Sequence, residues 1–123
     1  MNAYENNAFF WQKLDTLYLS SKLIIDRAKN TCHYKYSNLV YPVDYGYLVD
    51  TTGTDQAPVD VFKGSEKSNL VQGIVVSADI LKKDCDVKLL VGCSEEEEHE
   101  ILVFLNQTEF HRGDEVPEWA SND

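Results

Sequence analysis

The sequence is poor in cysteine, and the few cysteines that it has form no close pair. Cys32, Cys85 and Cys93 are an odd number and include no C-x-x-C motif. A structural zinc site takes closely paired ligands, so the spacing disfavours one here. We expect reduced, partly buried thiols instead, which are typical of a cytoplasmic protein.

Long hydrophobic runs are also missing. No apolar stretch approaches the roughly 20 residues needed to span a bilayer. The first residues, MNAYENN, are not basic and are not followed by an apolar segment, so no signal peptide is indicated. We therefore expect a soluble, cytoplasmic protein without a membrane partner.

Basic residues are scarce. The chain has 11 Lys and Arg against 21 Asp and Glu, a formal net charge of −10. The electric field of this negative charge repels polyanions, which argues against a nucleic-acid partner. It leaves room for a small anion held by local cations, and an acidic site suits a hard divalent metal ion.

The hydrophobic pattern predicts one domain over residues 1–123, with the last dozen residues loosely ordered. Phe10, Leu14, Leu17 and Tyr18 form the apolar stripe of a helix over 7–19, and Ser94 to Glu97 fits a capping box before a helix that ends near Gln107. Short strands are expected at 22–26, 39–48, 59–63, 70–80 and 86–91. The order favours a mainly β (α+β) domain, a small and mainly antiparallel barrel flanked by an N-terminal and a C-terminal helix.

Aspartates occur where the predicted strands begin or end. Asp55 and Asp60 flank a proline-containing turn, Asp79 ends the strand GIVVSAD and Asp86 opens DVKLL. Carboxylates at one rim of a barrel can converge on a divalent cation. The alternative is that aspartate simply favours turns and strand ends.

Lysine and tyrosine side chains supply candidate phosphate contacts. Lys88 lies two residues from Asp86 and so on the same face of a strand, either as a salt-bridge partner or as a cation aimed at a shared anion. Tyr41, Tyr45 and Tyr47 alternate around Gly46. They form either an aromatic core face or a face from which one hydroxyl reaches a phosphate oxygen.

Three motifs in order, YPVDYGYL, TTGTDQAPVDVF and GIVVSAD…DVKLL, resemble those of the soluble family I inorganic pyrophosphatases. The resemblance covers residues 22–91. Residues 24–48, from IIDRAKNTCHYKYSN to YGYL, resemble a shortened bacterial branch more closely. The resemblance implies an OB-like five-stranded antiparallel barrel with helices packed outside and the site at one rim.

The resemblance also implies roles for individual residues. Asp55, Asp60, Asp79 and Asp86 match the family's Mg²⁺ ligands, of which Asp55, Asp60 and Asp86 are the catalytic carboxylates. Tyr45 and Lys88 match phosphate-binding residues. Lys22 matches a further lysine, and Arg27, Lys29 and Lys35 are the candidates to replace an arginine that precedes the tyrosine motif.

Several positions depart from the family pattern. Ala57 replaces the aspartate that orients or deprotonates the attacking water, Gln56 replaces a glycine, and Ile24 replaces a glutamate. Asp84 competes with Asp86 as a ligand because the spacing from Asp79 is longer. Asp44 or Asp79 could stand in for the missing base. A long C-terminal helix with Tyr–Lys phosphate contacts is truncated or absent.

These features lead to three hypotheses. The first is magnesium-dependent hydrolysis of inorganic diphosphate to two phosphates. The second is a catalytically weak or inactive module that keeps the metal and diphosphate pocket, and the third is hydrolysis of another phosphoanhydride, such as a nucleotide. Both a monomer and a homo-oligomer are compatible with the sequence.

Overall fold

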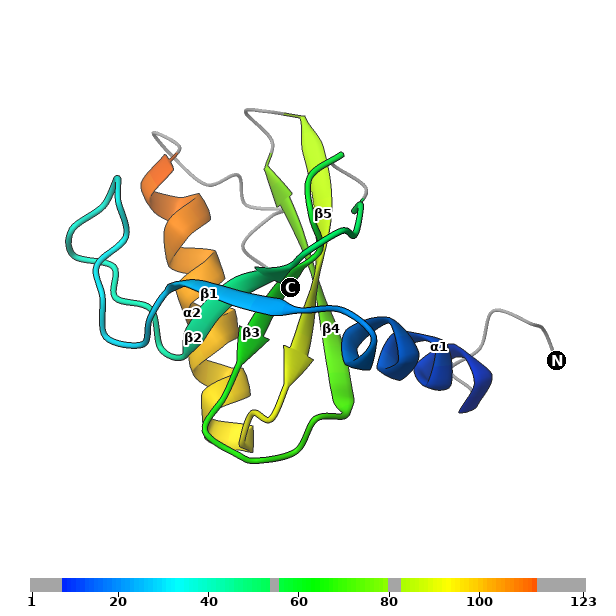
Figure 1. Ribbon diagram of the computed structural model, residues 1–123. Helices are drawn as coiled ribbons and strands as arrows, with labels where there is room; N and C mark the ends of the chain where they lie inside the picture. Colours follow the sequence, from blue (N-terminus) through cyan, green and yellow to red (C-terminus); the bar gives the residue numbers. More distant parts are fainter. Residues whose placement is uncertain (1–7, 54–55, 80–82, 113–123) are drawn as a thin grey trace, which may run out of the picture.

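The computed structural model describes residues 8–53, 56–79 and 83–112, in which five strands form one sheet with a helix on each face (Figure 1). The elements are α1 Ala8–Leu19, β1 Leu23–Arg27, β2 Asp44–Leu48, β3 Asp60–Lys63, β4 Val71–Asp79, β5 Asp84–Val91 and α2 Glu95–Arg112. No helix within these ranges is both long and apolar enough to span a bilayer.

Every predicted helix and strand is present, and most bounds lie within two residues of the prediction, but the start of β2 and the end of α2 each differ by five residues. β2 begins at Asp44, because residues 39–43 belong to the preceding loop, where the Asn30 N–H donates to the Tyr41 carbonyl and the Tyr41 N–H donates to the Thr31 carbonyl. α2 continues to Arg112, and the sequence contains no glycine or proline from Glu95 until Gly113.

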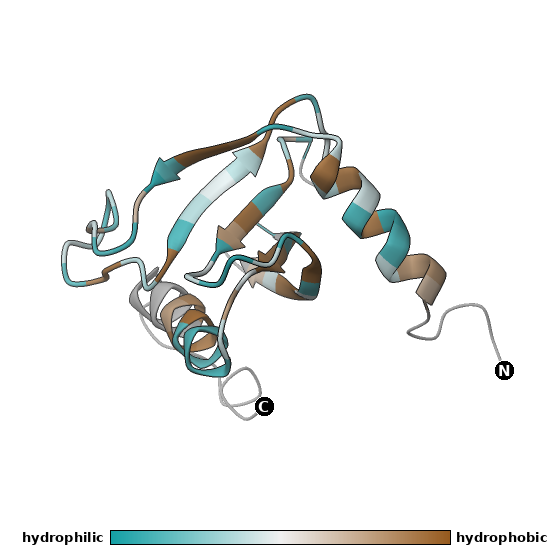
Figure 2. Ribbon diagram, turned by 60° about the horizontal axis from the view of Figure 1, so that its bottom comes forward, coloured by the Kyte–Doolittle hydropathy of each residue, from teal (hydrophilic) through white to brown (hydrophobic). Residues whose placement is uncertain are grey.

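The strand order is β1-β2-β3-β5-β4. Three neighbouring pairs are antiparallel, while β3 and β5 are parallel because β4 lies outside β5 and sends the chain back beside β3. The sheet curves strongly (Figure 2) but ends at β1 and β4 within the described residues. The mixed α+β class is confirmed; the term barrel applies only loosely, since these two edges do not pair.

Gly46 sets how closely β1 approaches β2. A Cβ atom at this position would collide with the Ile24 carbonyl oxygen and would lie 2.9 Å from the Ile25 Cα. Only glycine lets the two backbones come this close, which accounts for the glycine between Tyr45 and Tyr47.

The core has two layers, one on each face of the sheet. Tyr18 of α1 packs with Leu48, Val61 and Leu89, and Ile101 of α2 packs on the opposite face. The predicted stripe of α1 is partly wrong, because Phe10 is 42% exposed while Trp11 packs against the core. The Phe62, Val75 and Leu90 side chains line the α2 face.

The capping box of α2 is confirmed. The Glu97 N–H donates to the Ser94 hydroxyl at 3.1 Å, and the Ser94 N–H donates to the Glu97 carboxylate at 2.9 Å. The Ser65 N–H adds a bond to the same carboxylate at 3.2 Å. Burial raises the pKa of Glu97, but these backbone donors outweigh it and hold the pKa below its ordinary value.

Candidate active site

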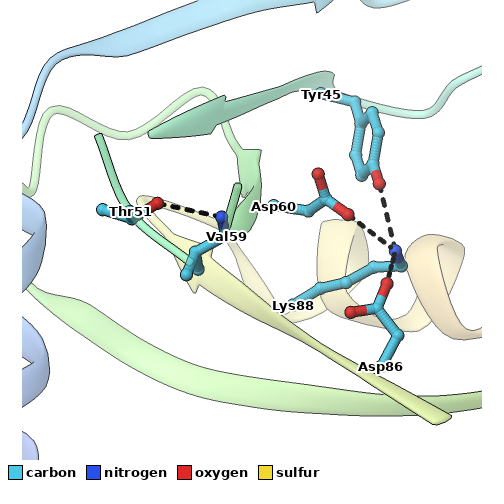
Figure 3. A network of polar contacts seen from close by, with 6 residues as sticks. All are labelled: Tyr45, Thr51, Val59, Asp60, Asp86 and Lys88. Atoms are coloured by element: carbon cyan, nitrogen blue, oxygen red, sulfur yellow. Dashed lines mark hydrogen bonds and ion pairs between the residues drawn. The ribbon is translucent and has the colours of Figure 1, made fainter. Parts of the chain in front are cut away.

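Lys88 is the centre of a polar cluster on the α2 face of the sheet. Its ammonium nitrogen lies 2.7 Å from an Asp86 carboxylate oxygen and 3.2 Å from an Asp60 carboxylate oxygen (Figure 3). The parallel pairing of β3 with β5 sets Asp60 directly beside Lys88, and Asp86 is two residues away on the same strand. Two strands far apart in the sequence thus supply two carboxylates to one cation.

Tyr45 completes the cluster from β2. Lys88 donates to the Tyr45 hydroxyl oxygen at 3.0 Å, so its three N–H groups serve one phenol and two carboxylates. The Tyr45 ring packs against Phe62 with centroids 4.7 Å apart. Burial raises the pKa of the Tyr45 hydroxyl, which therefore stays protonated and donates to Asp60.

The electrostatic environment couples these groups. Burial raises the pKa of the Asp60 carboxyl, although Lys88 and Tyr45 act in the opposite direction. Burial alone would lower the pKa of Lys88, but Tyr45 and Asp86 raise it above its ordinary value. The side chains of Lys88, Asp60 and Asp86 are only 12%, 23% and 19% exposed, so the ion pairs are poorly screened by solvent.

A second feature is the narrow neck of the loop that precedes Asp60. The Thr51 hydroxyl donates to the Leu48 carbonyl at 2.7 Å and accepts from the Val59 N–H at 2.9 Å (Figure 3). The Leu48 N–H donates to the Val59 carbonyl at 2.9 Å. These bonds fix the two ends of the loop next to the cluster.

The turn inside this loop has a residue with a left-handed backbone conformation, which usually requires glycine. Gln56 has a φ of 69°, and its N–H donates to the Gly53 carbonyl at 3.1 Å. The Gly53 N–H in turn donates to the Ala57 carbonyl at 2.6 Å. A left-handed conformation costs a residue with a side chain roughly 1–2 kcal/mol, so the turn is held by its hydrogen bonds.

Comparison with known protein families matches most of the chain. The family described as Pyrophosphatase: Inorganic pyrophosphatase matches residues 16–108, which include all five strands, the last turn of α1 and most of α2. The chain belongs to the inorganic pyrophosphatase family. Hydrolysis of diphosphate is the general activity of that family. A search of curated proteins found no match.

The structure brings together only some of the predicted site residues. Tyr45, Asp60, Asp86 and Lys88 form the cluster. Asp55 lies outside the described residues, and for Asp79 and Asp84 the structure describes the backbone pairing of β4 with β5 but not the side chains.

Four other cations were predicted as candidates to bind phosphate, and the structure shows a contact or a strand position for each. Arg27 pairs with Tyr45 across β1 and β2, and its guanidinium lies beside the Tyr41 hydroxyl. Lys29 donates its backbone N–H to Asp44 at 2.8 Å, and the Lys35 ammonium lies 5.8 Å from the centre of the Tyr36 ring. Lys22 precedes β1, at the end of that strand away from Arg27.

The donor set partly fits a divalent metal ion. Among the described residues no group of three or more His, Cys, Asp and Glu side chains is close enough to form a metal site. Asp60 and Asp86 nevertheless face one position that a cation, the Lys88 ammonium, occupies. The two carboxylates together carry more negative charge than the single ammonium can neutralise, which leaves negative charge for a metal ion. Oxygen ligands of this kind suit Mg²⁺.

Sequence reasoning missed one residue that organises the site, Thr51, and it missed the contact that Tyr41 makes with Arg27. Thr51 closes the loop neck, and Tyr41 joins Arg27 to Tyr45, against whose ring it stacks with centroids 5.6 Å apart. A threonine before a loop carries no recognisable signal. The alternation of Tyr41 with Tyr45 was visible, but the Arg27 contact depends on strand pairing.

Proposed function

We propose that this protein hydrolyses inorganic diphosphate to two phosphates with the help of Mg²⁺, and that the cluster around Lys88 is the reaction site. The observation that carries the proposal is the convergence of Asp60, Asp86 and Tyr45 on the Lys88 ammonium. The family match agrees with the substrate.

The described residues support a binding role in the first place. A phosphate oxygen can replace one of the three acceptors around Lys88, and the Tyr45 hydroxyl can donate to a second oxygen. Arg27 extends the cationic surface past Tyr41. Phosphoryl transfer depends chiefly on positioning and on charge stabilisation, which buried donors provide efficiently.

Asp60 and Asp86 would hold the metal ion, with Asp55 and Asp79 as further proposed ligands. When bound, Mg²⁺ would neutralise diphosphate charge and lower the pKa of a water molecule. Asp60 and Asp86 would also keep Lys88 protonated and aimed into the site. We expect slow turnover, because Ala57 offers no carboxylate to orient or deprotonate that water.

Phosphate release from diphosphate with Mg²⁺ tests this function. The wild-type protein should release phosphate, and both Asp60→Asn and addition of a chelator should abolish the release. Asp60→Asn keeps the side-chain shape and removes the charge. Equal rates for the wild type and Asp60→Asn would contradict the proposal.

A second candidate is a module that binds metal and diphosphate without turnover. Ala57 favours it, because the Ala57 carbonyl closes the turn with Gly53 and the position has no acid or base. Calorimetry with Mg²⁺ and methylenediphosphonate would then show binding, while the phosphate assay would show no release. Release that Asp60→Asn abolishes would exclude this candidate.

A further inference from the structure

The ladder between β2 and β3 opens at the point where β3 begins. The two strands pair as a regular antiparallel ladder up to Tyr47 with Asp60. The next pair is Leu48 with Val59, in which the Leu48 N–H donates to the Val59 carbonyl at 2.9 Å. In a regular ladder, the Val59 N–H of such a pair would return a direct bond to the Leu48 carbonyl.

The Thr51 hydroxyl takes the place of this direct bond. It accepts from the Val59 N–H at 2.9 Å (Figure 3) and donates to the Leu48 carbonyl at 2.7 Å. Two bonds in series span more than the roughly 2.9 Å of a single N–H···O bond, so the hydroxyl holds the two backbones apart at this pair. Bulges disrupt a ladder in a similar way and occur often next to active sites, where they re-aim a side chain.

Asp60 is the residue that directly follows this opening. It is the first residue of β3, and its backbone lies between Tyr47 of β2 and Lys88 of β5. A change in the separation of Leu48 and Val59 therefore moves the start of β3, and the Asp60 carboxylate moves with it.

The contacts that the Asp60 carboxylate can make depend on this placement. One of its oxygens lies 3.2 Å from the Lys88 ammonium, and the other is turned away from Lys88 (Figure 3). The oxygen that is turned away can bind a metal ion without displacing the ammonium. Mg²⁺ requires a nearly octahedral arrangement of its ligands, so a small displacement of one ligand lowers its affinity.

Groups that hold a metal ligand in place contribute to metal affinity although they do not touch the metal ion. We propose that Thr51 is a positioning residue for Asp60: its hydroxyl holds β2 and β3 apart beside Asp60 and thereby sets the carboxylate for Mg²⁺. This inference rests on the proposed function, in which Asp60 binds the metal ion.

Binding of Mg²⁺ alone, measured by calorimetry, tests the role of the hydroxyl separately from turnover. Thr51→Val keeps the shape of the side chain and removes the hydroxyl. It should weaken Mg²⁺ binding about tenfold, the lower end of the usual effect of losing the support of a metal ligand. Thr51→Ser keeps the hydroxyl and should bind Mg²⁺ as tightly as the wild type.

Thr51→Ala separates positioning from stability, because the smaller side chain lets the Val59 N–H and the Leu48 carbonyl approach and bond directly. Urea denaturation should show that it recovers part of the stability that Thr51→Val loses. It should still bind Mg²⁺ about tenfold more weakly than the wild type. A role in stability alone would instead make the Mg²⁺ affinity follow the free energy of unfolding, and if Thr51→Val does not fold, Thr51→Ala and Thr51→Ser still decide between the two.

Glu97→Gln is the matched control, because it removes a hydrogen-bonded charge at the start of α2, outside the Lys88 cluster. It should lower stability and leave the Mg²⁺ affinity unchanged. If the wild type binds Mg²⁺ and Thr51→Ala binds it equally well, or if Thr51→Ser binds as weakly as Thr51→Ala, the inference is wrong and the proposed function stands. If the wild type itself does not bind Mg²⁺, both are wrong.

Discussion

At the scale of single residues, Ala57 is the reason to expect slow hydrolysis of diphosphate, because it offers no carboxylate to the attacking water. Its side chain is exposed, and only its main chain takes part in the turn with Gly53. Ala57→Asp therefore introduces a carboxylate without removing an observed bond. General-base assistance is worth about 10²–10⁴-fold, so we expect kcat for diphosphate to rise by about tenfold or more.

Ala57→Asn is the control for this gain, because asparagine has the same shape as aspartate but cannot take a proton. It should leave kcat near the wild-type value. Initial rates of phosphate release at saturating diphosphate and Mg²⁺ measure both variants. Equal rates for the two would show that the missing base does not limit turnover.

The second prediction at the scale of single residues concerns Lys88. Lys88→Met should lower kcat/KM for diphosphate by about 10²–10³-fold, the usual effect of removing one donor to a developing charge. The same change removes the ammonium that neutralises Asp60 and Asp86. Mg²⁺ should consequently bind Lys88→Met at least as tightly as the wild type in calorimetry. Weaker Mg²⁺ binding would contradict the placement of both carboxylates at the metal ion.

How much of the site was predictable also follows from single residues. Lys88 and Asp86 share a strand, so their spacing alone predicts a common face. Asp60 joins them through the parallel pairing of β3 with β5, which the antiparallel expectation did not contain. Without the ordered motifs of the family resemblance, the sequence would not have linked Asp60 to Lys88.

At the scale of elements, the periodicity and capping signals predicted every helix and strand that the structure describes. They could not predict which strands pair, because β4 and β5 form a hairpin that could join either edge of the sheet. They also placed Phe10 in the core, whereas the neighbouring Trp11 takes that position. A pattern of apolar spacing does not distinguish between adjacent large aromatic residues.

The start of α2 gives a prediction about pH. Glu97→Gln removes the charge from a carboxylate that accepts the Ser94 and Ser65 N–H groups, and should lower the free energy of unfolding by about 1–3 kcal/mol at pH 7. The folded-state pKa lies below the ordinary value of 4.5. This stabilisation is therefore present above pH 4.5 and lost as the pH falls through the lower folded-state pKa.

Urea denaturation of the wild type and Glu97→Gln at pH 7 and at pH 3 measures this difference. It should be largest at pH 7 and shrink at pH 3. The exposed neighbour Glu96→Gln is the control, and should change stability little at either pH. A difference that is independent of pH would show that the charge of Glu97 does not stabilise the capping box.

At the scale of the whole molecule, acidic charge and local basic charge have different consequences. The net charge of −10 repels large polyanions, while the segment from Arg27 to Val43, which contains Lys29 and Lys35 and no aspartate or glutamate, attracts small ones beside the site. Composition alone predicted the first effect. The second depends on the fold, which brings the basic segment to the edge of the Lys88 cluster.

The rates at which the three cysteine thiols react test whether the whole fold is intact. Cys32 and Cys85 are exposed, whereas Cys93 is buried between the sheet and α2. Burial, followed by the nearby Glu97 charge, raises the pKa of the Cys93 thiol to about 11. Because the thiolate is the reactive form, the raised pKa by itself should slow the reaction of Cys93 with a disulfide reagent at pH 8 about 10²-fold, and burial of the thiol limits the reaction further.

Two thiols should thus react quickly in the native protein, and the third only at the rate of unfolding or after addition of denaturant. Cys93→Ala should abolish the slow phase and leave the fast one. The raised pKa also implies that the contribution of the neutral thiol to stability is complete below pH 9.0 and is lost as the pH rises towards 11. Three thiols that react at one rate would mean that α2 does not cover Cys93 in solution.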